Sequence, residues 1–378
     1  MKERVVIFGL GKLFGYAFDR IAEQYEIVAL VDNCIKVLER HDQIKIYAPD
    51  EITGVEFDRV IITVYDLHVF EEMKYQLIMC GVEASKICML EADIPEGEKE
   101  ILDNFKKLNG VNIAEQPASP LVSQLARRHD IAAWSDRWCD GHGLKYGMDR
   151  KTWEFMYISQ VLLEQNQLLP GNYGLGFAVG KEPLPALFAC FGCKVTATDL
   201  RDDMPSSQGW ARTNQHSSSL LDLHFPLICD ESTLFANVRF IPLNMNEIPD
   251  DLNDFDFCWS SCAFEHLETV EQSKQFVLNT LELLKPGGIS VHTTEFNLSS
   301  ANNAGVPSDH VFGKDFFDEL REEIMSMGHH FAPFDYRLGE HSDDDYVFRR
   351  SEELSPHFKL WSYGCIATSI GFYIVKAM

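Results

Sequence analysis

Three side chains able to accept a proton follow apolar runs in the C-terminal half of the chain. Glu265 and His266 come just after FDFCWSSCAF, and Glu295 ends ISVHTTEF. Imidazole titrates near neutral pH, so His266 is the first candidate for a general base, followed by Glu265 and Glu295. A histidine at the start of a helix can equally cap or pack it. A Glu, His and Glu set could hold Mg²⁺, but such sites usually carry denser carboxylates, so we expect no metal.

A second group of residues, within 172–199, has the spacing of a nucleoside-binding turn. The sequence NYGLGFAVGKEPLPALFACFGCKVTATD predicts a strand, a glycine-bearing turn, a helix opening at two prolines, and a strand ending on Asp199. Backbone N–H groups in such a turn can hold a nucleoside, and the carboxylate can bind ribose hydroxyls. The marked turn positions are either Gly174 and Gly176 or Ala178 and Gly180. We prefer the second register, because nineteen residues then separate Gly180 from Asp199.

This register also fixes the neighbours of the turn. Phe177 ends the strand, and Glu182 lies at the helix N-terminus, where Pro183 is tolerated because its missing N–H would have no partner. Downstream, NVRFIPLNMNEIP predicts another strand followed by a polar turn. In that turn, Asn244 can accept a hydrogen bond from an adenine amino group and Met245 can lie against the ring.

The first ninety residues carry a glycine turn of their own. RVVIFG and EIVALVDN predict two strands, joined by a glycine turn and an amphipathic helix. Gly9, Gly11 and Gly15 are spaced GxGxxxG, one residue off the dinucleotide fingerprint, and Asp32 stands about where a ribose-binding acid would lie. Taken alone, this predicts an NAD enzyme, although the unit is roughly half of a full dinucleotide domain. The alternative is that it binds nothing and serves dimerisation or docking.

The stretch between these parts offers further candidate contacts. Its three tryptophans, between residues 134 and 153, could roof a site or bury the seam between two domains. His142 and Tyr146 lie in the glycine-rich loop DGHGLKYG and are candidates for substrate contacts. His310 closes NLSSANNAGVPSDH, a long polar segment of the kind that shapes a substrate pocket.

Length and composition limit the kinds of protein that the chain can be. A chain of 378 residues is too long for one ordinary core, which favours two domains. The 33 Lys and Arg against 58 Asp and Glu give a net charge of −25, a field that repels phosphate backbones, so we expect no nucleic-acid partner. No run approaches 18 apolar residues, and the ten cysteines are scattered, so we expect a cytoplasmic protein without a membrane span. The oligomeric state stays open.

Five segments together resemble the class I methyltransferases that use S-adenosylmethionine, in particular bacterial enzymes associated with surface-glycan biosynthesis. The segments are GLGFAVGKEPLP, VTATDL, FDFCWSSCAFEHL, LLKPGGISVHTTEFNLSS and HFKLWSYGCIATSIGFYIVK, over about residues 150–378. The resemblance implies a mostly parallel, seven-stranded sheet with the cofactor across the carboxyl ends of its strands. The chain departs from the family's acidic-x-Gly-x-Gly pattern, with glycine and alanine at the first two marked places, and Glu182 is a candidate substitute for the acid. The residues assigned to the cofactor are Phe177, Ala178, Gly180, Glu182, Asp199, Leu200, Asn244, Met245 and Ser260.

The N-terminal unit resembles the small Rossmann-like nucleotide-sugar-binding domain of bacterial sugar acetyltransferases, through IFGLGKLFG, VALVDN and VIITV. We therefore expect an α/β protein with two Rossmann-like domains, at 1–92 and 151–378, and a helical connector or cap at 93–150. The resemblance implies O-methylation of a small-molecule glycan precursor, a sugar or nucleotide sugar of capsule or O-antigen biosynthesis, with S-adenosylhomocysteine as product. The alternatives are an NAD-linked oxidoreductase working from the N-terminal turn and a non-catalytic scaffold of the same pathway.

Overall fold

The computed structural model describes residues 2–378 except 11–13, 15–17, 19–20, 34–39, 42–43, 65–66, 91–97, 115, 201–215, 250, 301–310, 349–356 and 363–364. The chain forms two compact units, Met1–Glu96 with Arg349–Ser355, and Gly97–Phe348 with Pro356–Met378. Gly11, Gly15 and His310, three of the candidate site residues, lie outside the described residues.

The first unit contains a six-stranded sheet in the order β3-β4-β2-β1-β5-β6. Its elements are β1 (Arg4–Phe8), β2 (Glu26–Val31), β3 (Arg40–His41), β4 (Ile44–Tyr47), η2 (Pro49–Gly54), β5 (Arg59–Ile62), α2 (Leu67–Met79), η3 (Ala84–Lys86) and β6 (Ile87–Met89). The apolar run of β1 is buried because β1 is a central strand, paired in parallel with both β2 and β5. Gly9 therefore follows β1 where the strand order reverses.

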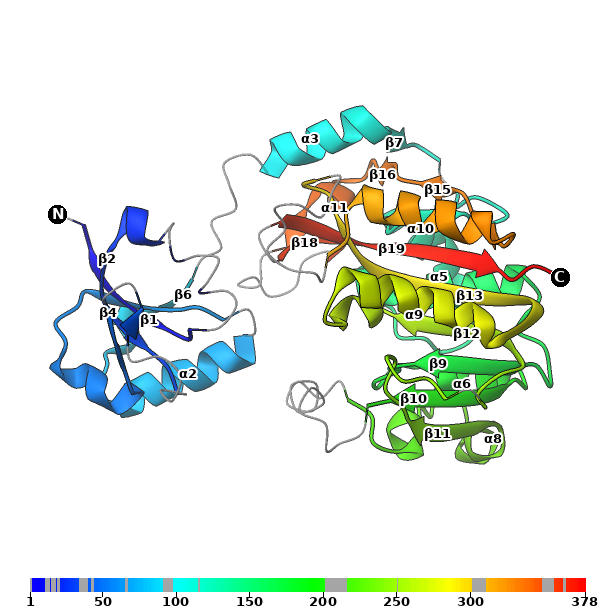
Figure 1. Ribbon diagram of the computed structural model, residues 1–378, viewed down its shortest axis with the longest axis horizontal. Helices are drawn as coiled ribbons and strands as arrows, with labels where there is room; N and C mark the ends of the chain where they lie inside the picture. The colour runs from blue at the N-terminus through cyan, green and yellow to red at the C-terminus, as the bar shows by residue number, and fades with distance from the viewer. Residues whose placement is uncertain are drawn as a thin grey trace. The chain divides into compact units, whose positions relative to one another are not determined.

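The second unit is built on a larger sheet, whose main path runs β11-β10-β9-β12-β13-β19-β18-β17 (Figure 1). The strands of this path are β9 (Tyr173–Phe177), β10 (Lys194–Asp199), β11 (Val238–Pro242), β12 (Phe255–Ser261), β13 (Leu284–Asn297), β17 (Val347–Phe348), β18 (Lys359–Ser362) and β19 (Cys365–Val375). The first five strands of the path are parallel, and β19 runs antiparallel to β13. The carboxyl ends of β9, β10, β12 and β13 therefore meet at one edge.

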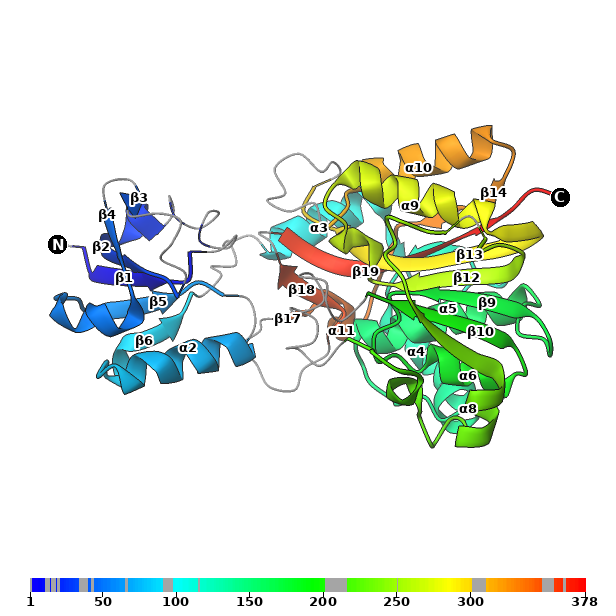
Figure 2. The same cartoon turned by 60° about the horizontal axis from the view of Figure 1, so that its bottom comes forward.

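Apolar side chains on both faces explain why this sheet is sandwiched between helices. In β12, Phe257 and Trp259 belong to one buried cluster, whereas Cys258 between them belongs to the cluster on the opposite face. Figure 2 shows α9 and α10 on one side of the sheet and α4, α6 and α8 on the other. The helices of this unit are α3 (Glu98–Asn109), α4 (Arg128–Ser135), α5 (Arg150–Glu164), α6 (Leu184–Cys190), α8 (Glu231–Asn237), α9 (Val270–Glu282), α10 (Lys314–Ser326) and α11 (Ser342–Asp345), with single turns at η5 (Leu220–Leu223) and η6 (Phe264–His266).

The sheet is wider than the sequence predicted. It contains eleven strands among the described residues, against seven expected, because short strands line the free edge of β19. These are β18, β8 (Ser123–Leu125) and β14 (His330–Phe331), while β15 (Phe334–Asp335) pairs with β8. A separate pair joins β7 (Val111–Asn112) to β16 (Leu338–Gly339). Part of the stretch expected as a helical connector is therefore a strand of this sheet.

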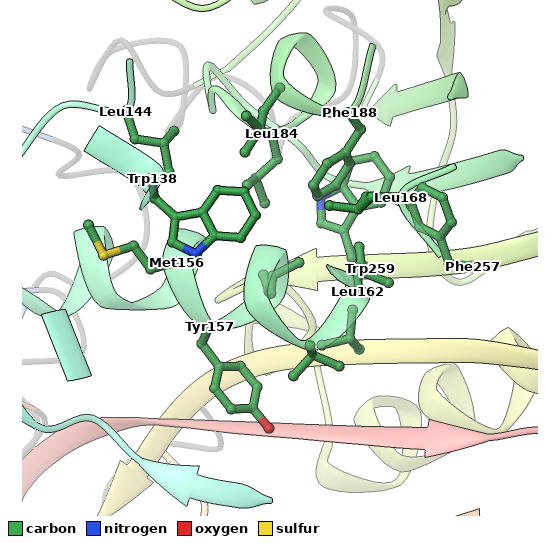
Figure 3. Packing of buried hydrophobic residues seen from close by; sticks show 14 of the residues in the cluster. Trp138, Leu144, Met156, Tyr157, Leu162, Leu168, Leu184, Phe188, Phe257 and Trp259 are labelled. Carbon is green, nitrogen blue, oxygen red and sulfur yellow. The ribbon is translucent and has the colours of Figure 1, made fainter. Parts of the chain in front are cut away.

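The three tryptophans between residues 134 and 153 also belong to this core. Trp134, Trp138 and Trp153 are buried in the cluster that includes Trp259 of β12. Figure 3 shows Trp138 and Tyr157 packed among the aliphatic side chains of this cluster. The indole N–H of Trp153 donates to Asp130 at 2.8 Å, so its polar atom is satisfied inside the core. These side chains stabilise the second unit internally.

Candidate functional site

The turn between β9 and α6 is sharply bent at two residues. Ala178 has a φ of 47° and Gly180 a φ of 51°, both in the left-handed region. For alanine this conformation costs roughly 1–2 kcal/mol, so the surrounding structure must impose it. The backbone N–H of Val179 donates to the Thr198 carbonyl at 2.9 Å and ties the turn to β10. Phe177, just before the turn, is fully buried.

Asp199 ends β10 beside this turn. One carboxylate oxygen accepts from the Leu200 backbone N–H at 2.8 Å, and the other accepts from the Ser217 N–H at 3.0 Å. His216 Nδ1 lies 3.3 Å from the second oxygen, and the Gly180 backbone also donates to this carboxylate. Burial raises the pKa of Asp199, although these donors oppose the shift. The structure thus joins the Asp199 carboxylate to the turn.

The other residues predicted to contact the cofactor differ in burial and in the hydrogen bonds that they already make. Asn244 uses its side-chain oxygen to accept from the Asn246 backbone N–H at 3.0 Å, which forms a local turn, so the oxygen expected to accept from an adenine amino group already has one donor. Met245 is buried in the core. Ser260 is fully buried, and its hydroxyl is 2.7 Å from His292 Nδ1, so it is engaged within the sheet.

Glu182 lies on the helix side of the turn and is buried. Its Oε1 accepts from the Trp259 indole N–H at 2.6 Å. Burial raises the pKa of Glu182 to about 8. Trp259 also occupies the side-chain space of Gly176 in β9, because a Cβ added at Gly176 would collide with the six-membered ring of this indole. Phe188 of α6 packs edge-on against the same indole, with ring centroids 4.9 Å apart.

One ion pair joins the start of α5 to the carboxyl end of β13, and a second lies within the first turns of α5. Arg150 Nη2 lies 2.6 Å from Glu295 Oε1 at the end of β13, and Lys151 Nζ lies 2.6 Å from Glu154 Oε2. Glu154 also accepts from the Ser261 hydroxyl at 3.2 Å and from the Ser369 hydroxyl at 2.5 Å. The Asp149 carboxylate caps α5 by accepting from the Thr152 N–H at 2.8 Å, which holds the cations in position.

The charged groups in this cluster shift one another's pKa values. Burial opposes ionisation of Glu154, but Lys151 and Arg150 outweigh it and lower the pKa of Glu154. Burial, assisted by the nearby Glu295 carboxylate, raises the pKa of Glu265 to about 8. A buried carboxyl that holds its proton at neutral pH therefore lies beside a carboxylate held by arginine, and once ionised it is a stronger base than an ordinary carboxylate.

The turn after β12 brings Glu265 to this cluster. Cys262 has a φ of 47°, and its backbone N–H donates to the Thr293 carbonyl at 2.9 Å, so the chain reverses directly at the strand end. Glu265 follows in η6 and is fully buried. His266 is half-buried, and its backbone N–H donates to Ala263. Of the three predicted proton acceptors, Glu265 and Glu295 are thus brought together, and Glu295 is paired with Arg150.

The remaining candidate residues are His142 and Tyr146, expected to contact the substrate, and those of the N-terminal turn. His142 packs against Trp138 and Phe191, with ring centroids 5.5 and 4.9 Å away, and burial lowers its pKa. Tyr146 is 52% exposed. In the first unit, the Asp32 carboxylate accepts from the Leu10 N–H at 2.7 Å, next to the Gly9 turn.

Sequence reasoning missed four site residues. Arg150 ends the stretch expected as a connector, and Lys151 and Glu154 begin the expected second domain, but none of them was a candidate, nor was Trp259 in the run FDFCWSSCAF. The one usable signal was the Lys151 and Glu154 spacing, an i,i+3 pair of opposite charge at a helix start. The described residues contain no group of three or more His, Cys, Asp or Glu side chains that could hold a metal ion, and none of their helices is long and apolar enough to cross a membrane.

Comparison with known proteins gives two family matches. Residues 175–292 match a model described as a methyltransferase domain, and residues 1–88 match the model described as C2185-like, N-terminal. Among solved structures, the chain is similar to a candidate sarcosine dimethylglycine methyltransferase from Galdieria sulphuraria, with 14% identity and a TM-score of 0.38 over 74% of this chain and 98% of that one. It is also similar to a TehB-like S-adenosylmethionine-dependent methyltransferase from Corynebacterium glutamicum, with 15% identity and a TM-score of 0.32 over 64% and 96% of the two chains. None of the curated proteins matches the chain.

The matched range spans the β9 turn, Asp199 and the end of β12, where the geometry described above lies. Residues 175–292, which contain this geometry, are therefore similar to a methyltransferase domain.

Proposed function

We propose that this protein transfers a methyl group from S-adenosylmethionine to a hydroxyl of a sugar, nucleotide sugar or related precursor of a bacterial surface glycan. The observation that carries the proposal is the polar cluster of Arg150, Glu265 and Glu295 at the carboxyl ends of neighbouring strands, beside the β9 turn. Such a cluster can bind a polar acceptor and take its proton. The substrate class itself rests on the sequence resemblance.

The residues of the β9 turn fit the cofactor. The Asp199 carboxylate, already held by backbone donors, is suited to accept hydrogen bonds from the ribose hydroxyls. Asn244 and Met245 would line the adenine, and Leu200, the residue after Asp199, would contact the adenosine. The cofactor supplies a methyl group already activated on a sulfonium cation. Buried acids around the turn, Asp199 and Glu182, favour a cationic ligand there.

The acceptor side offers both donors and a base. Arg150 Nη1 is buried and makes no hydrogen bond within the described part of the chain, so it is suited to donate to an acceptor oxygen. Lys151 supplies a second cation. Paired with Glu295 and Glu154, these two cations keep the cluster close to neutral although the protein has a net charge of −25, which would lower the repulsion of an anionic precursor such as a nucleotide sugar.

Glu265 is the base that this geometry favours. With a pKa of about 8, it accepts a proton more readily than an ordinary carboxylate. Glu295 is less suited, because Arg150 stabilises its ionised form. His266, the first choice from the sequence, stays the alternative base. Alignment of the acceptor oxygen with the methyl group would be provided by the surrounding ion pairs.

The test is methyl transfer from labelled S-adenosylmethionine to a panel of nucleotide sugars, read by mass. We expect one labelled methyl on a hydroxyl oxygen of at least one member. A product labelled on nitrogen or carbon would contradict O-methylation, and binding of S-adenosylhomocysteine without turnover on any glycan precursor would contradict the substrate class.

A further inference from the structure

The position that carries an acid in the acidic-x-Gly-x-Gly pattern is Gly176 in this chain, and its side-chain space is filled from the neighbouring strand. Gly176 of β9 is paired with Trp259 of β12. A Cβ on residue 176 would collide with the Trp259 indole and would also approach a methyl group of Val179. An aspartate or glutamate at this place is therefore incompatible with Trp259 in its present position. The absence of a side chain at residue 176 is what allows the Trp259 ring to lie there.

The same indole orients another acid. The Trp259 N–H donates to Glu182 Oε1 at 2.6 Å, across 77 residues of sequence. Glu182 is only 6% exposed and comes two residues after Gly180, on the turn proposed to hold the cofactor. Within the described residues, its second oxygen, Oε2, receives no hydrogen bond. A buried carboxyl with one oxygen fixed and the other available is suited to bind a cationic group.

The charged groups around Glu182 favour this use. Lys151 of α5 lowers the pKa of Glu182, whereas Asp199 of β10 and Glu154 of α5 raise it. Burial and these two acids raise the pKa of Glu182, whereas a bound ammonium group would lower it. Binding of such a group would therefore expel the proton from Glu182.

We propose that Glu182, oriented by the Trp259 indole, binds the amino group of the cofactor's methionine moiety in place of the acid that is absent at Gly176. This inference rests on the proposed function, because it assumes that S-adenosylmethionine binds at the β9 turn. In this arrangement Glu182 contacts the cofactor, and Trp259 is a positioning residue.

The test compares S-adenosylhomocysteine with 5′-methylthioadenosine, which shares the thioadenosine part but lacks the amino acid. Calorimetry on the full chain should show that Glu182→Gln weakens S-adenosylhomocysteine by about tenfold or more, the range expected for a lost charged hydrogen bond, and leaves methylthioadenosine within about twofold. Trp259→Phe, which removes only the N–H donor and part of the ring, should weaken S-adenosylhomocysteine by a smaller factor with the same selectivity. Glu282→Gln, at an exposed site ending α9, is the matched control and should change neither.

A measurement on the wild-type protein guards against a variant that misfolds. At pH 7, titrations in buffers of different ionisation heat should show that S-adenosylhomocysteine releases close to one proton more than methylthioadenosine does. Equal proton release by the two ligands, or equal affinity of Glu182→Gln and wild type for S-adenosylhomocysteine, would overturn the inference while leaving the methyltransferase function in place. If Glu182→Gln weakens the binding of both ligands alike, the difference in proton release between the two ligands on the wild-type protein decides whether the inference holds. Failure of the wild type to bind S-adenosylhomocysteine at all would instead overturn the proposed function.

Discussion

Glu265 combines complete burial with a carboxylate neighbour, and its charge state should control the reaction. Replacement by glutamine should lower kcat by about 100-fold or more, because general-base catalysis typically contributes roughly 10²–10⁴-fold. For the wild type, kcat/KM should rise with pH and level off above about pH 8, since the carboxyl must lose its proton before it can accept one. Methyl-transfer rates with the true acceptor, measured from about pH 6 to 9, check both expectations.

The same assay with His266→Ala separates the two candidate bases. We expect this variant to keep most of its turnover, because His266 is only half-buried and lies beyond Glu265 in η6. Loss of turnover in His266→Ala together with normal turnover in Glu265→Gln would transfer the assignment to the histidine.

At the scale of elements, close packing of β9 against β12 sets the shape of the site. Gly174 and Gly176 leave room for the rings of Phe257 and Trp259, which fill the side-chain space above β9. Figure 3 shows these two rings close to Phe188 of α6. The glycines that look like turn residues in the sequence are therefore strand residues that admit large neighbours.

Gly176→Ala should lower the free energy of unfolding by about 1–3 kcal/mol, the usual cost of overpacking a core. A second change, Trp259→Leu, should recover part of this loss in the double variant, because it removes the ring that the new Cβ meets. Gly54→Ala is the matched control, since a Cβ at Gly54 meets nothing within 4 Å, and it should be close to neutral. Chemical denaturation measures the free energy of unfolding of each variant. If the effects of Gly176→Ala and Trp259→Leu simply add in the double variant, the contact between residue 176 and the Trp259 ring is contradicted.

At the scale of the whole molecule, burial of acids makes stability depend on pH. Glu182 and Glu265 each have a folded-state pKa of about 8, above the ordinary value of 4.5, so the folded protein binds more protons than the unfolded chain between these values. Stability contributed by the protonated groups is therefore lost as pH rises through this window. Below about pH 6.5 the opposite effect of buried His292, whose pKa is lowered to about 3, partly offsets the trend.

We expect the free energy of unfolding of the ligand-free protein to fall by about 3 kcal/mol between about pH 6.5 and 8, at about 1.4 kcal/mol per pH unit for each fully shifted group. Denaturant titrations at several pH values measure the slope. The double variant Glu182→Gln with Glu265→Gln should flatten it, and an equally steep decline in that variant would show that other groups are responsible.

Local patterns predicted much of the framework because they depend on near neighbours in the chain. The order of strand, turn, helix and strand from residue 173 to Asp199 follows from apolar runs, two glycines and two prolines. The same patterns misjudged the edge strands. Ser123–Leu125 is too short to give a periodic signal, and its place in the sheet depends on pairing with β19, more than two hundred residues away.

By itself, the sequence determined that a turn with Gly180 would lie near Asp199, since a helix and a strand of known length connect them. Only the tertiary structure decided which distant side chains meet there. Glu182 faces Trp259, Arg150 faces Glu295 and Glu154 faces Ser369 because α5 and strands β9, β12, β13 and β19 pack together. Burial is a property of that packing, and it is burial that turns ordinary glutamates into groups with a pKa of about 8.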